Sequence, residues 1–189
     1  MGASQGEMTR RSFNRYLQYT EKHSTQTLRQ GMEEYFKANP QITYPDQMRA
    51  DFSKLLMAHD ITHVVFGYDT DMRDEWRLFF FTFFVSTYTF KDYVRAYQDW
   101  LADRKDPAVS ALLDDVMKEQ NAFSWYSWAV ISLLLVLPEI VVMWFQTRGH
   151  QKYWSYYEYE PMFERSLLDI RQEFSLLGFI PSKGDRGQK

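Results

Sequence analysis

The sequence contains no cysteine among its 189 residues. This absence excludes disulfides, thiolate catalysis, iron–sulfur clusters and Cys-rich zinc folds, and it leaves His, Asp and Glu as the metal-ligating side chains. The chain also lacks a long block of like charge. Its 25 acidic and 22 basic residues give a net charge of -3. Because these charges are spread along the chain, the sequence indicates no surface for binding a polyelectrolyte, and we expect no nucleic-acid partner.

Targeting signals are also missing from the sequence. Gly6 stands where a myristoylation signal needs Ser or Thr, and no apolar signal-peptide core follows, so we expect no export. The polar residues 1–12 and 182–189 predict a flexible amino terminus and a flexible carboxy terminus. A chain of this length is typical of one domain, which we place at 13–181.

Runs of alternating apolar and polar residues are absent, and the apolar pattern is helical almost throughout. The prediction is an all-α, single-domain helical bundle. One helix is expected over 13–37, ending before Asn39-Pro40, and a second from Pro45-Asp46 to Gly67. The second helix should turn one apolar stripe inward, formed by Met48, Phe52, Leu55, Leu56, His59 and His63.

Aromatic residues are the abundant class, at 18% of the chain. A third helix, capped by Thr70 in the turn at 67–70, contains the run Trp76 to Val85 and continues toward Lys91-Asp92. That run is apolar on every side, so it must be buried on all faces or touch lipid. Some of the rings are therefore expected to face a ligand or lipid.

A second apolar run extends from Trp128 to Phe145, beyond a solvated break at 103–107 and a helix expected from about 108. A membrane-spanning helix takes about 20 apolar residues. Because Pro138-Glu139 interrupts this run, we expect a buried, kinked or broken helix rather than a transmembrane one.

A last amphipathic helix is expected beyond Glu160-Pro161. Its apolar face should contain Phe163, Leu167, Ile170, Phe174 and Leu177, with Arg165, Asp169 and Arg171 facing outward.

Four ligand-type side chains form the main candidate site. His59 and His63 are one helical turn apart on one face, Asp60 lies beside them, and the turn at 67–70 folds the next helix back so that Glu75 approaches. A lone His on an apolar face is more often a core residue, and a His pair arises by chance. Four such groups in an apolar neighbourhood favour a site for Zn²⁺, Fe²⁺, Mn²⁺ or Co²⁺.

The pattern His59-Asp60-x-x-His63, eleven residues and then Glu75 resembles the signature of the Coq-four family, the fourth coenzyme Q (ubiquinone) biosynthesis protein. The turn Gly67-Tyr68-x-Thr70 and the carboxy-terminal stretch Tyr157 to Arg171 are similar to that family as well. The similarity covers roughly residues 45–177.

This resemblance implies an all-helical homodimer on a membrane surface, with zinc or a similar ion held by the four motif residues as catalytic and metal-binding groups. It implies polyprenylated quinone precursors as substrates and other ubiquinone biosynthesis proteins as partners. The implied reaction, that of a carbon–carbon lyase or oxidative decarboxylase, replaces the ring carboxylate at C1 by hydroxyl; a scaffold role is the alternative. The implied location is the cytoplasmic face of the bacterial membrane, or the matrix side of the mitochondrial inner membrane.

A prenylated substrate needs an apolar channel, although such stripes are more often plain core. The residues that could line it are Phe79, Phe80, Phe83, Phe84, Trp125, Trp128, Leu133 and Trp144. A second aromatic group could form an interfacial belt beside cations or pack on the domain. It comprises Tyr153, Trp154, Tyr156, Tyr157 and Tyr159, next to Arg148, His150 and Lys152.

Two other functions compete with this interpretation. An HD-type phosphohydrolase would use His59-Asp60 with a distant His23 and a later Asp114 or Asp115, but it gains nothing from His63 or Glu75. The non-enzymatic alternative is a prenyl-lipid-binding assembly protein whose metal is structural. A zinc protease fits less well, because Asp60 would have to replace the catalytic Glu at a shorter reach.

Overall fold

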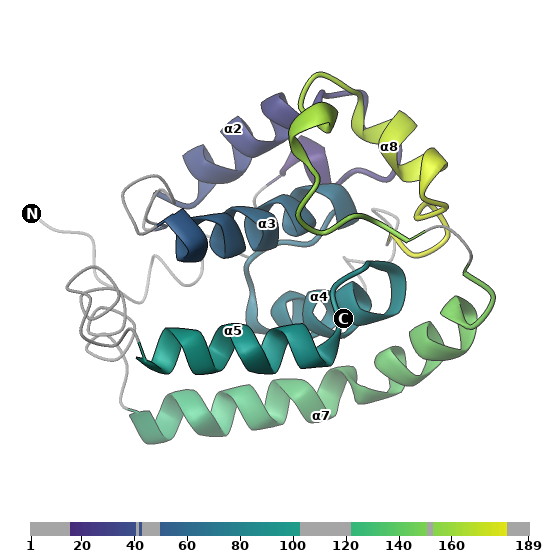
Figure 1. Cartoon of the computed structure of the whole chain (residues 1–189). Coiled ribbons are helices and arrows are strands. Elements are labelled where there is room, and N and C mark those ends of the chain that lie inside the picture. The colour runs from purple at the N-terminus through teal and green to yellow at the C-terminus, as the bar shows by residue number, and fades with distance from the viewer. Residues whose placement is uncertain (1–15, 41, 43–49, 103–121, 151–152, 181–189) are drawn as a thin grey trace, which may run out of the picture.

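The computed structural model describes residues 16–40, 42, 50–102, 122–150 and 153–180. Within these residues the fold is all-α, which confirms the predicted class (Figure 1). The helices are α2 (Leu28–Ala38), α3 (Ala50–Phe66), α4 (Met72–Val85), α5 (Phe90–Ala102), α7 (Ala122–Thr147) and α8 (Leu167–Glu173), with 3₁₀ turns η2 (Gln18–Thr20) and η4 (Glu160–Met162).

The first α-helix of the described chain begins much later than predicted. The structure has the 3₁₀ turn η2 in this region instead of a helix from residue 13. α2 begins only at Leu28, where Thr27 and Gln30 form a capping box. Thr27 Oγ1 accepts the backbone N–H of Gln30, and the Gln30 side chain accepts the N–H of Thr27. These two hydrogen bonds satisfy backbone N–H groups that have no carbonyl partner within the helix, and they therefore favour a helix start at this point. The predicted end before Asn39-Pro40 is confirmed.

α2 crosses α3 at very close range. A Cβ atom added to Gly31 would lie 2.5 Å from Cγ1 of Val64. Only the missing side chain of glycine allows this approach, and it brings the next turn of α2, with Tyr35, onto the middle of α3. α3 is described from Ala50, so the predicted start at Pro45-Asp46 lies outside the described residues.

The predicted third helix is in fact two helices. α4 ends at Val85, and α5 begins at Phe90. Between them the backbone leaves the helix to bond a distant segment: Thr87 N–H donates to the carbonyl of Trp154, and Trp154 N–H donates to the carbonyl of Val85. Thr89 and Asp92 then cap the new helix reciprocally. A tertiary contact and a cap, rather than apolar periodicity, set this boundary.

α7 is one continuous helix with Pro138 inside it, and much of its apolar surface is exposed, so of the predicted buried, kinked or broken forms the buried and the broken ones are wrong. It runs beside α4 along one side of the molecule (Figure 1). One narrow stripe is buried, formed by Ala129, Ser132, Val136, Ile140, Met143 and Thr147. The side chain of Arg77 on α4 lies 2.8 Å from Glu139, and Trp76 Nε1 donates to the carbonyl of Ala129, so polar bonds fix the two helices together.

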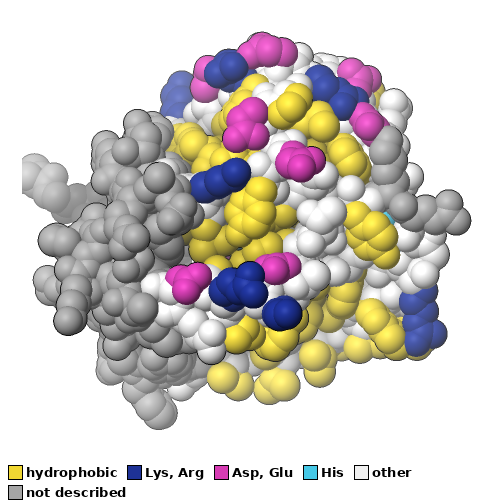
Figure 2. All heavy atoms as spheres, viewed as in Figure 1, with side chains coloured by type: hydrophobic (Ala, Val, Ile, Leu, Met, Phe, Trp, Pro, Cys, Tyr) yellow, Lys and Arg dark blue, Asp and Glu magenta, His cyan; other side chains and the backbone are white. Residues whose placement is uncertain are grey.

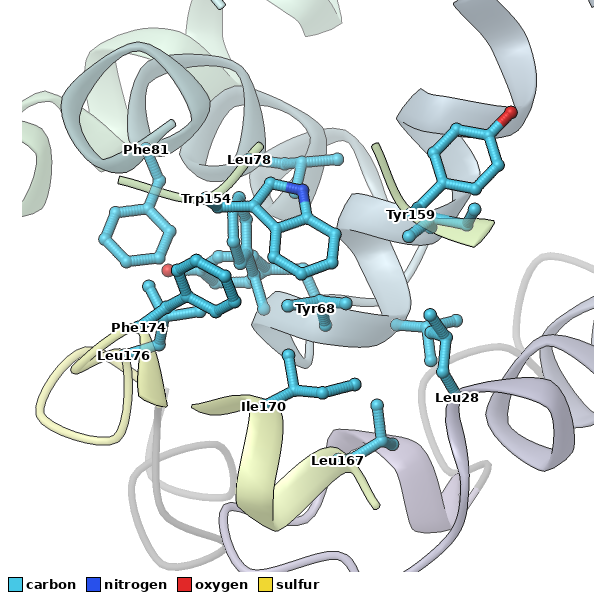
Figure 3. Packing of buried hydrophobic residues seen from close by; sticks show 14 of the residues in the cluster. Leu28, Tyr68, Leu78, Phe81, Trp154, Tyr159, Leu167, Ile170, Phe174 and Leu176 are labelled. Carbon is cyan, nitrogen blue, oxygen red and sulfur yellow. The ribbon is translucent and has the colours of Figure 1, made fainter. Parts of the chain in front are cut away.

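The carboxy-terminal segment completes the core. Of the two alternatives left open for its aromatic group, packing on the domain holds for Trp154, Tyr156 and Tyr159, which are buried. Figure 3 shows Trp154 and Tyr159 in this packing. Tyr153 and Tyr157 are partly exposed, Arg148 is exposed, His150 is half-buried, and Lys152 lies outside the described residues.

The last predicted helix has the expected apolar contacts at its centre but a different outer face. It begins at Leu167 rather than beyond Pro161, and Leu167, Ile170 and Phe174 are buried as predicted. Arg171, predicted to face outward, is completely buried.

Candidate metal centre

Three ligand-type side chains from two helices meet at one point. α3 supplies His59 and His63, and α4 supplies Glu75. His63 Nε2 lies 3.2 Å from Glu75 Oε1, and His59 Nε2 lies 3.6 Å from Glu75 Oε2. One ligand atom from each residue lies within 4.8 Å of the other two, so the three residues form a group that could hold a metal ion.

The turn between the two helices creates this convergence. Gly67 ends α3 with a φ of 72°, a left-handed conformation that favours glycine. The chain then reverses, and Asp71 accepts the backbone N–H groups of Arg73 and Asp74 as the cap of α4. The predicted cap, Thr70, is therefore wrong by one residue, whereas the predicted stop at Gly67 is confirmed. Glu75 follows in the first turn of α4, facing the two imidazoles.

His63 shows why this group suits an ion better than a hydrogen-bonded cluster. Its side chain is completely buried, yet neither ring nitrogen has a hydrogen-bond partner within the described residues. Nε2 is near Glu75 Oε1, but an N–H on that atom would not point at the oxygen. Leaving a buried polar atom unbonded is costly. A metal ion bound between the three ligand atoms would give Nε2 the partner that it lacks.

The electrostatics of the group also favour a cation. Burial lowers the pKa of His59, but the nearby carboxylates of Asp60 and Glu75 outweigh it and raise that pKa to about 10. Burial likewise opposes ionisation of Glu75, but the neighbouring His63 and His59 hold its pKa well below the usual range. The negative potential that attracts a proton to His59 attracts a metal ion in the same way.

Asp60 lies beside the group rather than in it. Its Oδ1 is 3.6 Å from Nδ1 of His59 and accepts a hydrogen bond of 3.0 Å from the hydroxyl of Tyr35 on α2. Burial, followed by the charges of Asp60 and Glu75, raises the pKa of Tyr35 far above its usual range, so the hydroxyl keeps its proton and remains a donor. This geometry favours Asp60 as a residue that orients the imidazole of His59 rather than as a ligand of the ion.

Tyr35 is the residue that inspection of the motif missed. Besides bonding Asp60, its ring stacks on His63 with the centroids 5.5 Å apart. Tyr35 thus holds Asp60 by a hydrogen bond and His63 by ring contact. The one sequence feature that could have indicated Tyr35 is Gly31, one turn earlier on α2. Its importance becomes clear only from the observed crossing of α2 and α3.

Arg171 holds the end of the helix that carries both histidines. Its guanidinium donates to the carbonyls of Val64 and Val65, in the last turn of α3, and to those of Tyr19 and Glu21. Carbonyls in the last turn of a helix have no partner within that helix, and the negative end of the helix dipole favours a cation there. A buried cation therefore replaces water as the donor and fixes the position of α3.

No family model, curated protein or solved structure matches the chain. The ligand assignment therefore depends on the chemistry of the residues present. Two imidazoles and one carboxylate form a donor set that suits zinc and other first-row divalent ions. His59 is 43% exposed and Glu75 34% exposed, so the side of the group away from His63 is open to water or a substrate.

The predicted channel residues occupy two different places. Phe79, Phe80, Phe83 and Phe84 are half-buried on α4, and Phe79 and Phe83 continue the row of Glu75 at four-residue intervals. Their rings touch, with centroids 4.8 Å apart. On α7, Trp128 and Trp144 are exposed at the outer surface. Leu133 is half-buried, and the side chain of Trp125 lies outside the described residues.

The residues of a phosphohydrolase site are not brought together in the described structure. His23 is exposed in the segment before α2 and is no member of the group formed by His59, His63 and Glu75. Asp114 and Asp115 lie outside the described residues.

Proposed function

We propose that this protein acts in ubiquinone biosynthesis as a metal-dependent enzyme on polyprenylated benzoquinone precursors, replacing the C1 carboxylate of the head group by hydroxyl. The observation that carries the proposal is the convergence of His59, His63 and Glu75 beside Asp60, in the motif that resembles the Coq-four family. Zinc is the ion we expect, because a His₂-carboxylate set with an open side is typical of catalytic zinc sites.

The proposed reaction breaks the bond between the ring and its carboxylate and forms a carbon–oxygen bond at the same ring carbon. Carbon dioxide leaves, and the ring carbon is oxidised by two electrons overall. Dioxygen is the oxidant: it takes up the two electrons and two protons and leaves as hydrogen peroxide, while water supplies the oxygen of the new hydroxyl group. A bound divalent ion would supply Lewis acidity toward the ring carboxylate and the neighbouring phenolic oxygen.

The side chains around the ion have three further roles: orienting a ligand, transferring a proton and supporting the prenyl chain. Asp60, held by Tyr35, favours the His59 tautomer with its proton on Nδ1, which leaves Nε2 free to bind a metal. Because Asp60 is not one of the three converging ligands, its carboxylate is also the group we assign to proton transfer. The aromatic row of Phe79 and Phe83 extends from Glu75 and supports a prenyl chain leading away from the head group.

A metal measurement tests the first step of this proposal. Purified protein analysed by inductively coupled plasma mass spectrometry is expected to carry about one divalent ion per chain, and His63→Ala should remove it. His23→Ala is the matched control, because it also removes an imidazole but outside the group; it should keep the metal and quinone production, whereas a phosphohydrolase would lose its activity. Protein that has all four motif residues but neither carries nor binds a divalent ion would contradict the proposal.

Complementation separates catalysis from assembly. A strain that lacks this protein should accumulate a carboxylated, prenylated intermediate, and His63→Ala should not relieve that accumulation. Loss of several later intermediates at once would instead indicate a scaffold. A normal quinone pool in the deletion strain would contradict both functions.

The second candidate is a prenyl-lipid-binding assembly protein with a structural ion. The complete burial of His63 favours it, since an ion held there would fasten α3 to α4. The discriminating variant is Asp60→Asn, which leaves the three converging ligands in place. With zinc supplied well above its dissociation constant, so that the ion stays bound, it should abolish turnover of the carboxylated intermediate if the protein is an enzyme, and leave the quinone pool intact if the ion is structural.

A further inference from the structure

α7 displays a broad apolar face that no described part of the chain covers. Its inner stripe packs on the domain, but ten large apolar side chains elsewhere on the helix are between 42% and 62% exposed. They are Trp128, Val130, Ile131, Leu134, Leu135, Leu137, Val141, Val142, Trp144 and Phe145. Soluble monomers rarely expose a contiguous apolar patch of this extent, so the face marks an interaction surface.

We propose that the outer face of α7 is a membrane-docking surface, and that the helix lies in the plane of one leaflet instead of spanning the bilayer. The segment Ser127–Thr147 has a mean hydropathy of 2.2, and 28% of its most apolar window is buried. Its one charged residue, Glu139, faces the domain and pairs with Arg77. The exposed face therefore presents no charge to an acyl layer.

The ends of this face have the chemistry of the headgroup region. Trp128 and Trp144 stand near its two ends, and the guanidinium of Arg148 lies 3.9 Å from the ring centroid of Trp144. Tryptophan and arginine are typical of the boundary between acyl chains and water. In Figure 2 hydrophobic side chains line the lower edge of the view, where α7 runs, and basic side chains stand at one end of it.

The packing of the opposite stripe decides the orientation. Ala129, Val136 and Met143 are buried along most of the helix, so α7 is attached to the domain over this length (Figure 1). A spanning orientation would draw α4 and the Arg77–Glu139 ion pair into the acyl region at great cost. Lying flat, the helix buries only its apolar side.

A second copy of this chain fits the face less well. Two paired helices cover one stripe on each partner. Here apolar residues such as Leu134, Leu135 and Leu137 point in several directions around the helix, which one partner helix would leave largely uncovered. An acyl layer covers such a rounded surface without needing a fixed register.

Flotation with vesicles tests the surface. The full chain is expected to float with phosphatidylcholine vesicles. Added phosphatidylglycerol should strengthen binding only slightly, because among the described residues the exposed face itself is uncharged and Arg148 stands at its end. Leu134→Glu with Val141→Glu should weaken partitioning at least about tenfold. The matched control, Thr25→Glu with Gln172→Glu, adds the same two charges at exposed positions away from α7 and should float like the unaltered chain.

The absence of cysteine makes the orientation measurable. An environment-sensitive dye at Ile131→Cys or Val142→Cys should shift to the blue on vesicle binding, and the same dye at Gln172→Cys should not. Ile131 and Val142 lie three turns apart on one face, about 16 Å along the helix. Quenching by lipids with spin labels at two depths should place both dyes equally shallow, whereas a spanning helix would place them at different depths.

Other outcomes would overturn the proposal. They are a chain that does not float, equal flotation of the Leu134→Glu/Val141→Glu variant, and dyes on α7 that are already in an apolar environment without vesicles. A dimer that this double variant dissociates, without vesicle binding by the unaltered chain, would assign the face to self-association. Since His63→Ala should float normally, failure of the proposed metal chemistry and failure of membrane docking are distinguishable.

Discussion

The phenolic hydroxyl of Tyr35 donates a hydrogen bond to Oδ1 of Asp60 across the α2–α3 interface, with the two oxygens 3.0 Å apart. Asp60 is 5% exposed, so this hydroxyl replaces the water that would otherwise solvate the carboxylate. The motif residue that stands outside the three-ligand group is thus fixed by a helix far from the motif in sequence.

Tyr35→Phe should therefore weaken both the site and the fold. Loss of the hydroxyl leaves a buried carboxylate short of one donor, which should lower the free energy of unfolding by about 1–3 kcal/mol. A residue that orients ligands typically contributes about 10–100-fold in metal affinity. Urea unfolding and competition with a chelator measure the two effects. Tyr153→Phe, at a 47% exposed position, is the control and should change neither.

Removal of the metal should lower the free energy of unfolding, because the ion binds the folded chain and not the unfolded one. A ligand at a hundred times its dissociation constant stabilises by about 2.7 kcal/mol. Excess chelator should thus lower the midpoint of thermal unfolding of the unaltered chain, and zinc should restore it. His63→Ala and Glu75→Gln should show neither response, because each removes one of the three converging ligands. An equal response in these variants would place the ion elsewhere.

Arg171→Met should be among the most destabilising single substitutions in the described chain. It leaves carbonyls of Val64, Val65, Tyr19 and Glu21 without their donor, and we expect a loss of about 3 kcal/mol or more in urea unfolding. Arg171→Lys should be intermediate, because an ammonium has three donors and no planar fork.

A second arginine provides the control for that measurement. Arg165 forms a partly exposed ion pair with Glu173, so Arg165→Met should cost no more than about 1 kcal/mol. Equal effects of the two Arg→Met substitutions would show that burial of the Arg171 guanidinium has no special role.

Gly31→Ala should separate α2 from α3 and disturb the metal centre from a distance. The added methyl group would overlap Val64, and overpacking typically costs about 1–3 kcal/mol. Val64→Ala in the same chain should recover part of the loss, and a double-mutant cycle measures this coupling. Gly149→Ala, with no atom within 4 Å of the added Cβ, is the control. An additive cycle would contradict the proposed contact.

Much of the site was predictable from local sequence because its geometry is mostly local. The one-turn interval from His59 to His63 and the glycine stop at Gly67 follow from helix periodicity and backbone conformation alone. Together with the interval to Glu75, they place three ligands on two consecutive helices. The position of Tyr35 beside the site was not predictable, because the sequence of α2 does not indicate which helix α2 crosses.

The sequence by itself determined the all-α class, the end of α3 and the meeting of His59, His63 and Glu75, since these depend on contacts between near neighbours in the chain. Only the tertiary structure decided the break after Val85, the burial of Arg171 and the outward face of α7. Apolar periodicity reports that a residue avoids water, but it does not state which surface covers it. The guanidinium of Arg171 is buried because carbonyls from distant segments meet it, and the outer face of α7 is exposed because no described side chain packs over it.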